Sequence, residues 1–137
     1  MNNDTIVFPA RKLASALERE VRRVLGKQDD EITQAEFDTI KTLWLDGNDI
    51  VDVSGLQLPA SLRTLYLNGN DIVDVSGLQL PASLQTLGLG GNHIVDVSGL
   101  QLSASLQTLW IDASDIVDVS GLKALKAKGV RIYGIRL

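Results

Sequence analysis

One 16-residue segment recurs almost unchanged along this chain. The segment GNDIVDVSGLQLPASL occupies residues 47–62 and recurs unchanged at 69–84, and a third copy at 91–106 differs only at His93 and Ser103. A period of this size is typical of a solenoid, in which each unit buries its apolar face only against neighbouring units. The chain aligns as four rows of 22 residues, which begin at Leu43, Leu65, Leu87 and Leu109.

Each row carries the pattern LxxLxLxxNxI, which the second row spells with Leu62, Leu65, Leu67, Asn70 and Ile72. The alternation of LxL has the period of a strand, so the two leucines face one side and the residues between them face the other. Successive strands lie 22 residues apart, so they must run in parallel, with right-handed connections between them. We therefore predict a right-handed coil of four to five parallel strands.

This pattern resembles the leucine-rich-repeat family, and the period of 22 together with DVSGL is similar to its bacterial internalin-like class. The match extends over about residues 40 to 133. The resemblance implies an α/β fold, namely a right-handed solenoid with a parallel sheet on its concave face and a helical N-terminal cap. It also implies a non-enzymatic module that binds a protein or peptide, whose identity the sequence does not give.

The segment before the repeats predicts the cap. Residues 9–25 read as a helix with Pro9 at its first position, and Gly26 ends it. TQAE at 33–36 reads as a capping box that opens a second helix. We expect a helical cap at 1–39, followed by a solenoid at 40–137 that forms a single structural unit. The helix has an apolar stripe that consists of Leu13, Leu17, Val21, Val24 and Leu25.

The return half of each row predicts short turns. In the first row we expect Ser54 to cap a helical turn that Leu56 and Leu58 anchor inward, and the same role falls to Ser76, Ser98 and Ser120. A longer helix is expected only in the fourth row, at GLKALKAKG. A last strand is expected at residues 130–133, and because nothing obviously covers its edge, self-association through this strand stays open.

Composition excludes several functions. The net charge is −4 and no apolar run approaches the ~18 residues of a membrane span, so neither nucleic acid nor a membrane is an expected partner. The chain has no cysteine, a single histidine and no GxSxG motif, so we expect no catalytic residue, no metal and no cofactor. The first residues lack the regions of a signal peptide, and the localisation stays open. One carboxylate column either bridges a cation or bonds its own turns, and it consists of Asp52, Asp74, Asp96 and Asp118.

Function is expected at the outward strand positions, because these vary while the rest of the row does not. One column reads Trp44, Tyr66, Gly88 and Trp110. The next column reads Asp46, Asn68, Gly90 and Asp112. Aromatic side chains provide large contact area at little entropic cost, so these eight residues are the candidate partner-binding surface. The alternative is aromatic packing across the strands that only stiffens the sheet.

Gly88 interrupts the aromatic column. If its backbone is bare, Tyr66 and Trp110 stand two strand spacings apart, ~10 Å, and the gap admits one side chain of a partner. The alternative is drift in one copy of a redundant repeat. For the whole chain, the alternative to a binding module is a recently amplified or engineered scaffold with no dedicated ligand, because the rows are nearly identical.

Overall fold

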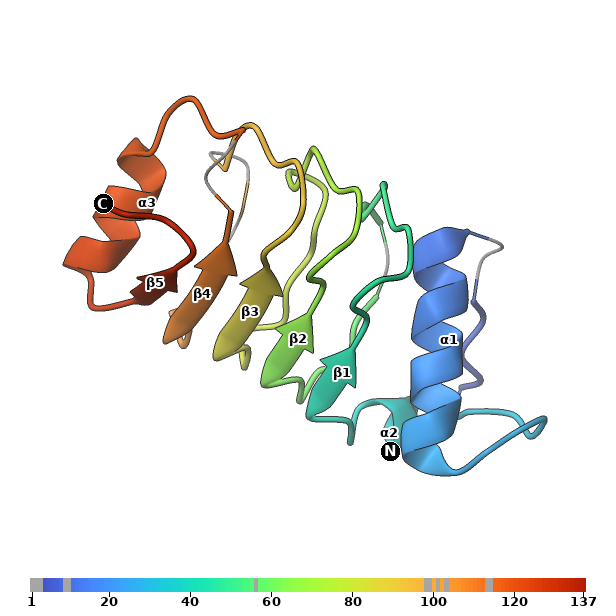
Figure 1. Ribbon diagram of the computed structural model, residues 1–137. Coiled ribbons are helices and arrows are strands. Elements are labelled where there is room, and N and C mark those ends of the chain that lie inside the picture. Colours follow the sequence, from blue (N-terminus) through green and yellow to red (C-terminus); the bar gives the residue numbers. More distant parts are fainter. Residues whose placement is uncertain are drawn as a thin grey trace.

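Five short strands form one parallel sheet in the order β1-β2-β3-β4-β5 (Figure 1). The computed structural model describes residues 4–8, 11–55, 57–97, 100, 102, 104–112 and 115–137. The predicted strand number and direction are confirmed. The strands are β1 (Thr42–Trp44), β2 (Thr64–Tyr66), β3 (Thr86–Leu89), β4 (Thr108–Ile111) and β5 (Arg131–Tyr133).

The register of the sheet follows the sequence period through four strands and then changes. Leu43 pairs with Leu65, and each later row repeats this 22-residue step as far as Leu109. Leu109 then pairs with Ile132, which is 23 residues further along the chain. The first leucine of every LxL motif therefore enters one aliphatic column of the core, and Leu43, Leu65, Leu87 and Leu109 are each at most 1% exposed.

Asparagine side chains join the coils just beyond the strands. The Asn70 amide oxygen accepts the backbone N–H groups of Asn48 and Ile50, and its nitrogen donates to the carbonyls of Leu45 and Leu67. One coil later the Asn92 amide oxygen accepts the N–H of Ile72, and its nitrogen donates to the carbonyls of Leu67 and Leu89. Both asparagines are buried. These asparagines form a ladder between the coils, and it satisfies turn groups that have no strand partner. Ser114, the next position of the ladder, lies outside the described residues.

Helix α1 (Lys12–Leu25) covers the end of the sheet beside β1 (Figure 1). Gly26 ends the helix as predicted, with a left-handed φ of 69°. The helix begins at Lys12, and Pro9 lies outside the described residues. Leu13, Leu17 and Val21 are buried as predicted.

One member of the predicted apolar stripe is wrong. Val24 is exposed, and Ala14, Ala16 and Glu20 join the buried face instead. Leu25, at the end of the helix, is half-buried and packs against the core. The burial of Glu20 could not be read from the sequence, because a charged helix residue is expected to face solvent.

Three side chains of the α1 segment take the place of a preceding coil. Glu20 accepts the backbone N–H of Trp44 at 2.8 Å, and Arg19 donates to the side-chain oxygen of Asn48 at 2.9 Å. Arg11, the residue before the helix, donates to the carbonyl of Ser54 at 2.8 Å. These bonds satisfy polar groups that a neighbouring coil satisfies elsewhere in the solenoid.

Helix α2 (Gln34–Phe37) has the predicted capping box. The Thr33 hydroxyl accepts the N–H of Glu36, and the Glu36 carboxylate accepts the N–H of Thr33. Phe37, the last residue of this helix, and Ile40 are both buried in the core.

The return segments correct the predicted role of the serines. No helix follows Ser54 or Ser76 among the described residues, and the N–H of each donates to the carboxylate two residues earlier, that of Asp52 or Asp74. The only return helix in the described part of the chain is α3 (Ser120–Ala127), as predicted. Ser120 is its first residue and not its cap, because the N-cap position is Val119, which makes no side-chain capping bond, and the Ser120 N–H donates to Asp118. Leu58 is buried, whereas Leu56 and Ser98 lie outside the described residues.

Candidate binding surface

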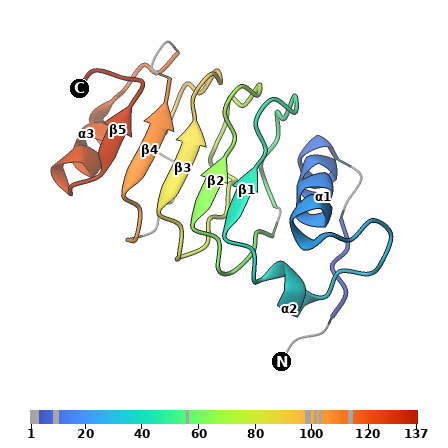
Figure 2. The ribbon, with the colours of Figure 1, turned by 60° about the horizontal axis from the view of Figure 1, so that its bottom comes forward.

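The aromatic side chains of the sheet form two pairs and not one column. The rings of Trp44 and Tyr66 lie 4.3 Å apart with a tilt of 33°. The rings of Trp110 and Tyr133 lie 4.5 Å apart and are stacked. Both tryptophans remain open to solvent, with 55% of Trp44 and 46% of Trp110 exposed. Figure 2 shows that β1 and β4, which carry the tryptophans, are separated by β2 and β3 in the sheet.

Tyr133 belongs to this surface and was missed in the sequence. It pairs in register with Trp110 on β4, but it comes 23 residues later and falls outside the 22-residue rows. The signal that reveals it is the alternation of RIY, which places Ile132 inward and Tyr133 outward.

The expected slot at Gly88 is wrong. A Cβ atom built at Gly88 lies 2.7 Å from Nδ2 of Asn68 and 2.9 Å from Cδ1 of Tyr66, so these side chains fill the space over the glycine. Gly88 is itself buried. The absent side chain therefore makes room for neighbours on β2 and the turn after it, and not for a partner's side chain.

The column that reads Asp46, Asn68, Gly90 and Asp112 links the ends of neighbouring strands through hydrogen bonds. Asp46 accepts the N–H of Asn68 at 2.7 Å, and Asn68 accepts the N–H of Gly90 at 2.8 Å. Asp112 in turn accepts the N–H of Gly91 at 3.1 Å. The predicted surface residues thus come together across four strands. Some of their side-chain oxygens already accept hydrogen bonds from backbone N–H groups of neighbouring coils.

The other carboxylate column bonds its own turns. The carboxylates of Asp52, Asp74 and Asp118 each accept the N–H two residues ahead at 2.9 Å. Hydrogen bonds from Ser54 and Ser76 lower the pKa of Asp52 and Asp74, and the backbone N–H of Ser120 lowers that of Asp118. Among the described residues, no group of three or more His, Cys, Asp or Glu side chains is arranged to hold a metal ion.

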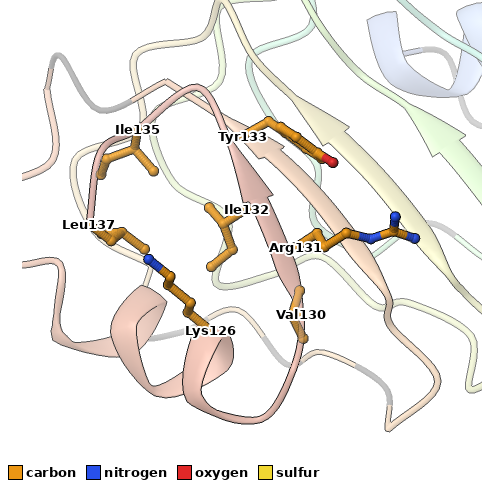
Figure 3. A pocket seen from close by; sticks show the side chains of 7 residues that line it. All are labelled: Lys126, Val130, Arg131, Ile132, Tyr133, Ile135 and Leu137. Atoms are coloured by element: carbon orange, nitrogen blue, oxygen red, sulfur yellow. The ribbon is translucent and has the colours of Figure 1, made fainter.

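The far end of the solenoid has a shallow apolar hollow beside β5 (Figure 3). Its volume is about 280 Å³, and Ile132, Ile135 and Leu137 form its half-buried apolar part. No described strand pairs with the outer edge of β5. The hollow is lined by Lys126, Val130, Arg131, Ile132, Tyr133, Ile135 and Leu137.

The parallel sheet, the aliphatic core column and the asparagine ladder define a leucine-rich-repeat solenoid. The family described as Leucine Rich repeats (2 copies) matches residues 60–102. The solved internalin inlF of Listeria monocytogenes str. 4b F2365 is 33% identical, with a TM-score of 0.72 over 87% of this chain. Internalin C2 (inlC2) of the same strain is 29% identical, with a TM-score of 0.74 over 95% of this chain. The chain is an internalin-like leucine-rich-repeat protein with a helical N-terminal cap.

The chain spans only part of these solved relatives, 35% of the length of inlF and 60% of inlC2. No curated protein sequence gives a significant match. Among the described residues, no helix combines the length and apolarity that crossing a bilayer requires. Proteins of this internalin-like class are typically non-enzymatic binding proteins.

Proposed function

We propose that this chain is a binding module that recognises a protein or peptide through the concave face of its sheet. Leucine-rich-repeat domains in general mediate protein–protein interaction, and solenoids present extended concave surfaces for this purpose. The observation that carries the proposal is the exposure of Trp44 and Trp110, in a chain whose aromatic content is only 4%. Burying two tryptophans inside such a chain is the default expectation, so two on one open face favour recognition.

The pairing of the rings supports this role. Each tryptophan is held against a tyrosine of the next strand, so the rings are ordered before a partner arrives and lose little entropy on binding. Tryptophan and tyrosine are also the residues most often found at energetic centres of interfaces. The proposed surface adds Tyr133 to the residues expected from the sequence and leaves out Gly88, which Asn68 and Tyr66 cover. It consists of Trp44, Asp46, Tyr66, Asn68, Gly90, Trp110, Asp112 and Tyr133.

Comparative capture tests the proposal. The wild-type chain and the double variant Trp44→Ala/Trp110→Ala are immobilised and exposed to the same protein mixture, and each captured protein is then purified and titrated. Val24→Asn is the matched control, because Val24 is an exposed apolar residue on α1, away from the sheet. A partner retained by the wild type and the control but lost by the double variant supports the concave face. A chain that captures nothing specific supports the scaffold alternative.

A second proposed association joins two copies at the outer edge of β5. The unpaired edge and the half-buried Ile132, Ile135 and Leu137 favour it. Residues 119–137 carry five cationic side chains and no carboxylate side chain, so two such ends repel and salt should strengthen their contact. Sedimentation at low and high salt tests this, with Ile132→Lys as the disrupting variant. Monomers under both conditions would exclude it.

We also propose that the chain consists of a helical cap at 1–39 and a solenoid at 40–137. We expect these two parts to unfold together, as one cooperative unit. The support is the set of bonds from Arg11, Arg19 and Glu20 to the first coil, which tie the two parts together. A single calorimetric transition tests it, since independent parts unfold in two.

A further inference from the structure

A row of exposed valines runs along the turn edge of the solenoid, in the loops that follow the arrowheads of Figure 1. In the first three coils the valine lies between a buried isoleucine and a buried valine, such as Ile50 and Val53, and in the fourth coil the corresponding Ile116 and Val119 are half-buried. Those neighbours already anchor the turn, so the fold does not require an apolar side chain facing solvent there. We call this row the valine ridge, and it consists of Val51, Val73, Val95 and Val117, which are 55%, 43%, 46% and 92% exposed.

Carboxylates flank the valine ridge on both sides along the chain. One flank carries Asp49, Asp71, His93 and Asp115, and the other carries Asp52, Asp74, Asp96 and Asp118, all of them exposed. The coils are in register at both flanks. On one flank the His93 side chain contacts the Asp115 carboxylate at 3.2 Å, and on the other the backbones of Asp74 and Asp96 form a parallel β-bridge. Between residues 42 and 118 the only Lys or Arg is Arg63. The ridge is therefore an apolar line within a strongly negative surface.

We propose that the valine ridge docks a basic amphipathic helix of a partner protein, lying along the solenoid axis. Complementary charge favours a cationic partner, and the exposed valines require an apolar stripe on it. Arg11 of this chain already illustrates the polar contact, because it approaches the carboxylate of Asp52 at 3.5 Å and donates to the adjacent Ser54 carbonyl. The same charge argument disfavours nucleic acid and anionic lipid surfaces.

The spacing of the ridge favours a helix over an extended strand. Coils repeat at ~4.8 Å, so the four valines span three spacings, ~14 Å. A helix presents one face every three to four residues, a rise of ~4.5–6 Å, and covers that span in about three turns. An extended strand presents one face only every ~6.6–6.8 Å and falls out of step with the coils. The occupant is thus a helix of roughly 10–14 residues with Lys or Arg on both sides of its stripe.

Binding of a defined peptide tests the ridge. The probe is a synthetic 14-residue peptide with leucines on one helical stripe and lysines or arginines beside it. Its control is a scrambled peptide of identical composition and charge that has no stripe. Anisotropy titrations at 0.15 M salt compare the wild type with Val73→Asn/Val95→Asn, which alters no charge, and with Val24→Asn, an exposed valine outside the ridge.

The expected result is at least a tenfold preference of the wild type and Val24→Asn for the striped peptide, and loss of that preference in Val73→Asn/Val95→Asn. Equal binding of the scrambled peptide, or an unchanged affinity of the double variant, would overturn the proposal. Tryptophan emission separates the ridge from the concave face, because both tryptophans lie on the sheet. A peptide that shifts this emission and loses affinity in Trp44→Ala/Trp110→Ala binds the concave face, which refutes the ridge and leaves the proposed function standing.

Discussion

The carboxylate of Glu20 accepts the backbone N–H of Trp44 at 2.8 Å, and this bond closes the N-terminal edge of the sheet. Arg23 donates two further hydrogen bonds to the same carboxylate. Burial alone raises the pKa of Glu20, but the bonds from Arg23 and Trp44 outweigh it and hold the pKa below its ordinary value. A charged helix residue therefore does the work that a neighbouring strand does elsewhere in the sheet.

Removing this carboxylate should destabilise the fold. Glu20→Ala leaves the N–H of Trp44 without its partner, which typically costs about 1–3 kcal/mol. Glu18→Ala is the control, since Glu18 forms a half-exposed pair with Arg22 on the same helix and accepts no N–H of the sheet's described strands, and such pairs contribute ~0–1 kcal/mol. Urea unfolding of both variants measures the difference. Equal losses in the two would show that the edge bond carries no special weight.

The asparagine ladder should be worth more inside the solenoid than at its end. Asn70→Ala leaves several backbone groups without a hydrogen-bond partner. We expect the free energy of unfolding to fall by about 2–4 kcal/mol, because several unsatisfied groups add up. Asn48 is the half-exposed first residue of the ladder, and both water and Arg19 reach it. Asn48→Ala should therefore lower the free energy of unfolding less than Asn70→Ala does. Thermal unfolding monitored by circular dichroism ranks the two, and the reverse order would contradict the ladder.

A side chain at Gly88 should destabilise the sheet. In Gly88→Ala the new Cβ lies too close to Asn68 and Tyr66, and such overpacking costs about 1–3 kcal/mol, more than the ~0.5–1 kcal/mol that replacing a strand glycine gains. Gly121→Ala is the control. Gly121 lies in α3, and among the described residues a Cβ there meets only Cγ2 of Val97, at an ordinary contact distance of 3.6 Å. That change should stabilise the helix by ~0.5–1 kcal/mol. A Gly88→Ala protein at least as stable as wild type would restore the open slot.

Acid should weaken the cap through Glu36. Hydrogen bonds from Lys27 and from the N–H of Thr33 lower the pKa of Glu36 from 4.5 to about 2. Because the folded pKa is the lower one, the unfolded chain takes up the proton first as pH falls. The stabilisation is complete above about 4.5 and disappears as pH falls through about 2.

Glu36→Gln tests this contribution, because glutamine keeps the capping box but loses the charge. The free energy of unfolding of the variant should fall less than that of the wild type between pH 5 and pH 2. Asp29→Asn serves as the control, since Asp29 is an exposed carboxylate of the segment that joins α1 to α2. Identical acid profiles for wild type and Glu36→Gln would contradict the assignment.

The sequence was sufficient wherever periodicity decides the structure. Leu65 and Leu67 had to face the core because their spacing has the period of a strand, and three further rows repeat them. The capping box at Thr33 and the left-handed Gly26 were equally readable, because each rests on local backbone chemistry.

The sequence was insufficient wherever one side chain reaches another coil. Glu20 looks like a solvated helix residue until the N–H of Trp44 is seen to lie beside it. The direction of the Asn68 side chain decides that Gly88 is covered, and no spacing rule gives that direction. Tyr133 was missed because α3 lengthens the last row by one residue.

The most direct test of the concave face is the affinity of a captured partner for Trp44→Ala/Trp110→Ala. Both side chains are about half exposed and each packs on a tyrosine, so the double variant should melt below the wild type by the loss of two ring pairs. Affinities are therefore compared at a temperature where circular dichroism shows both proteins folded, and loss of binding then reports the surface itself. We expect at least a tenfold weaker affinity in the double variant, equal affinities for the wild type and Val24→Asn, and a shift in tryptophan emission of the wild type upon binding. A partner that binds the folded double variant as tightly as the wild type would exclude the concave face as its site.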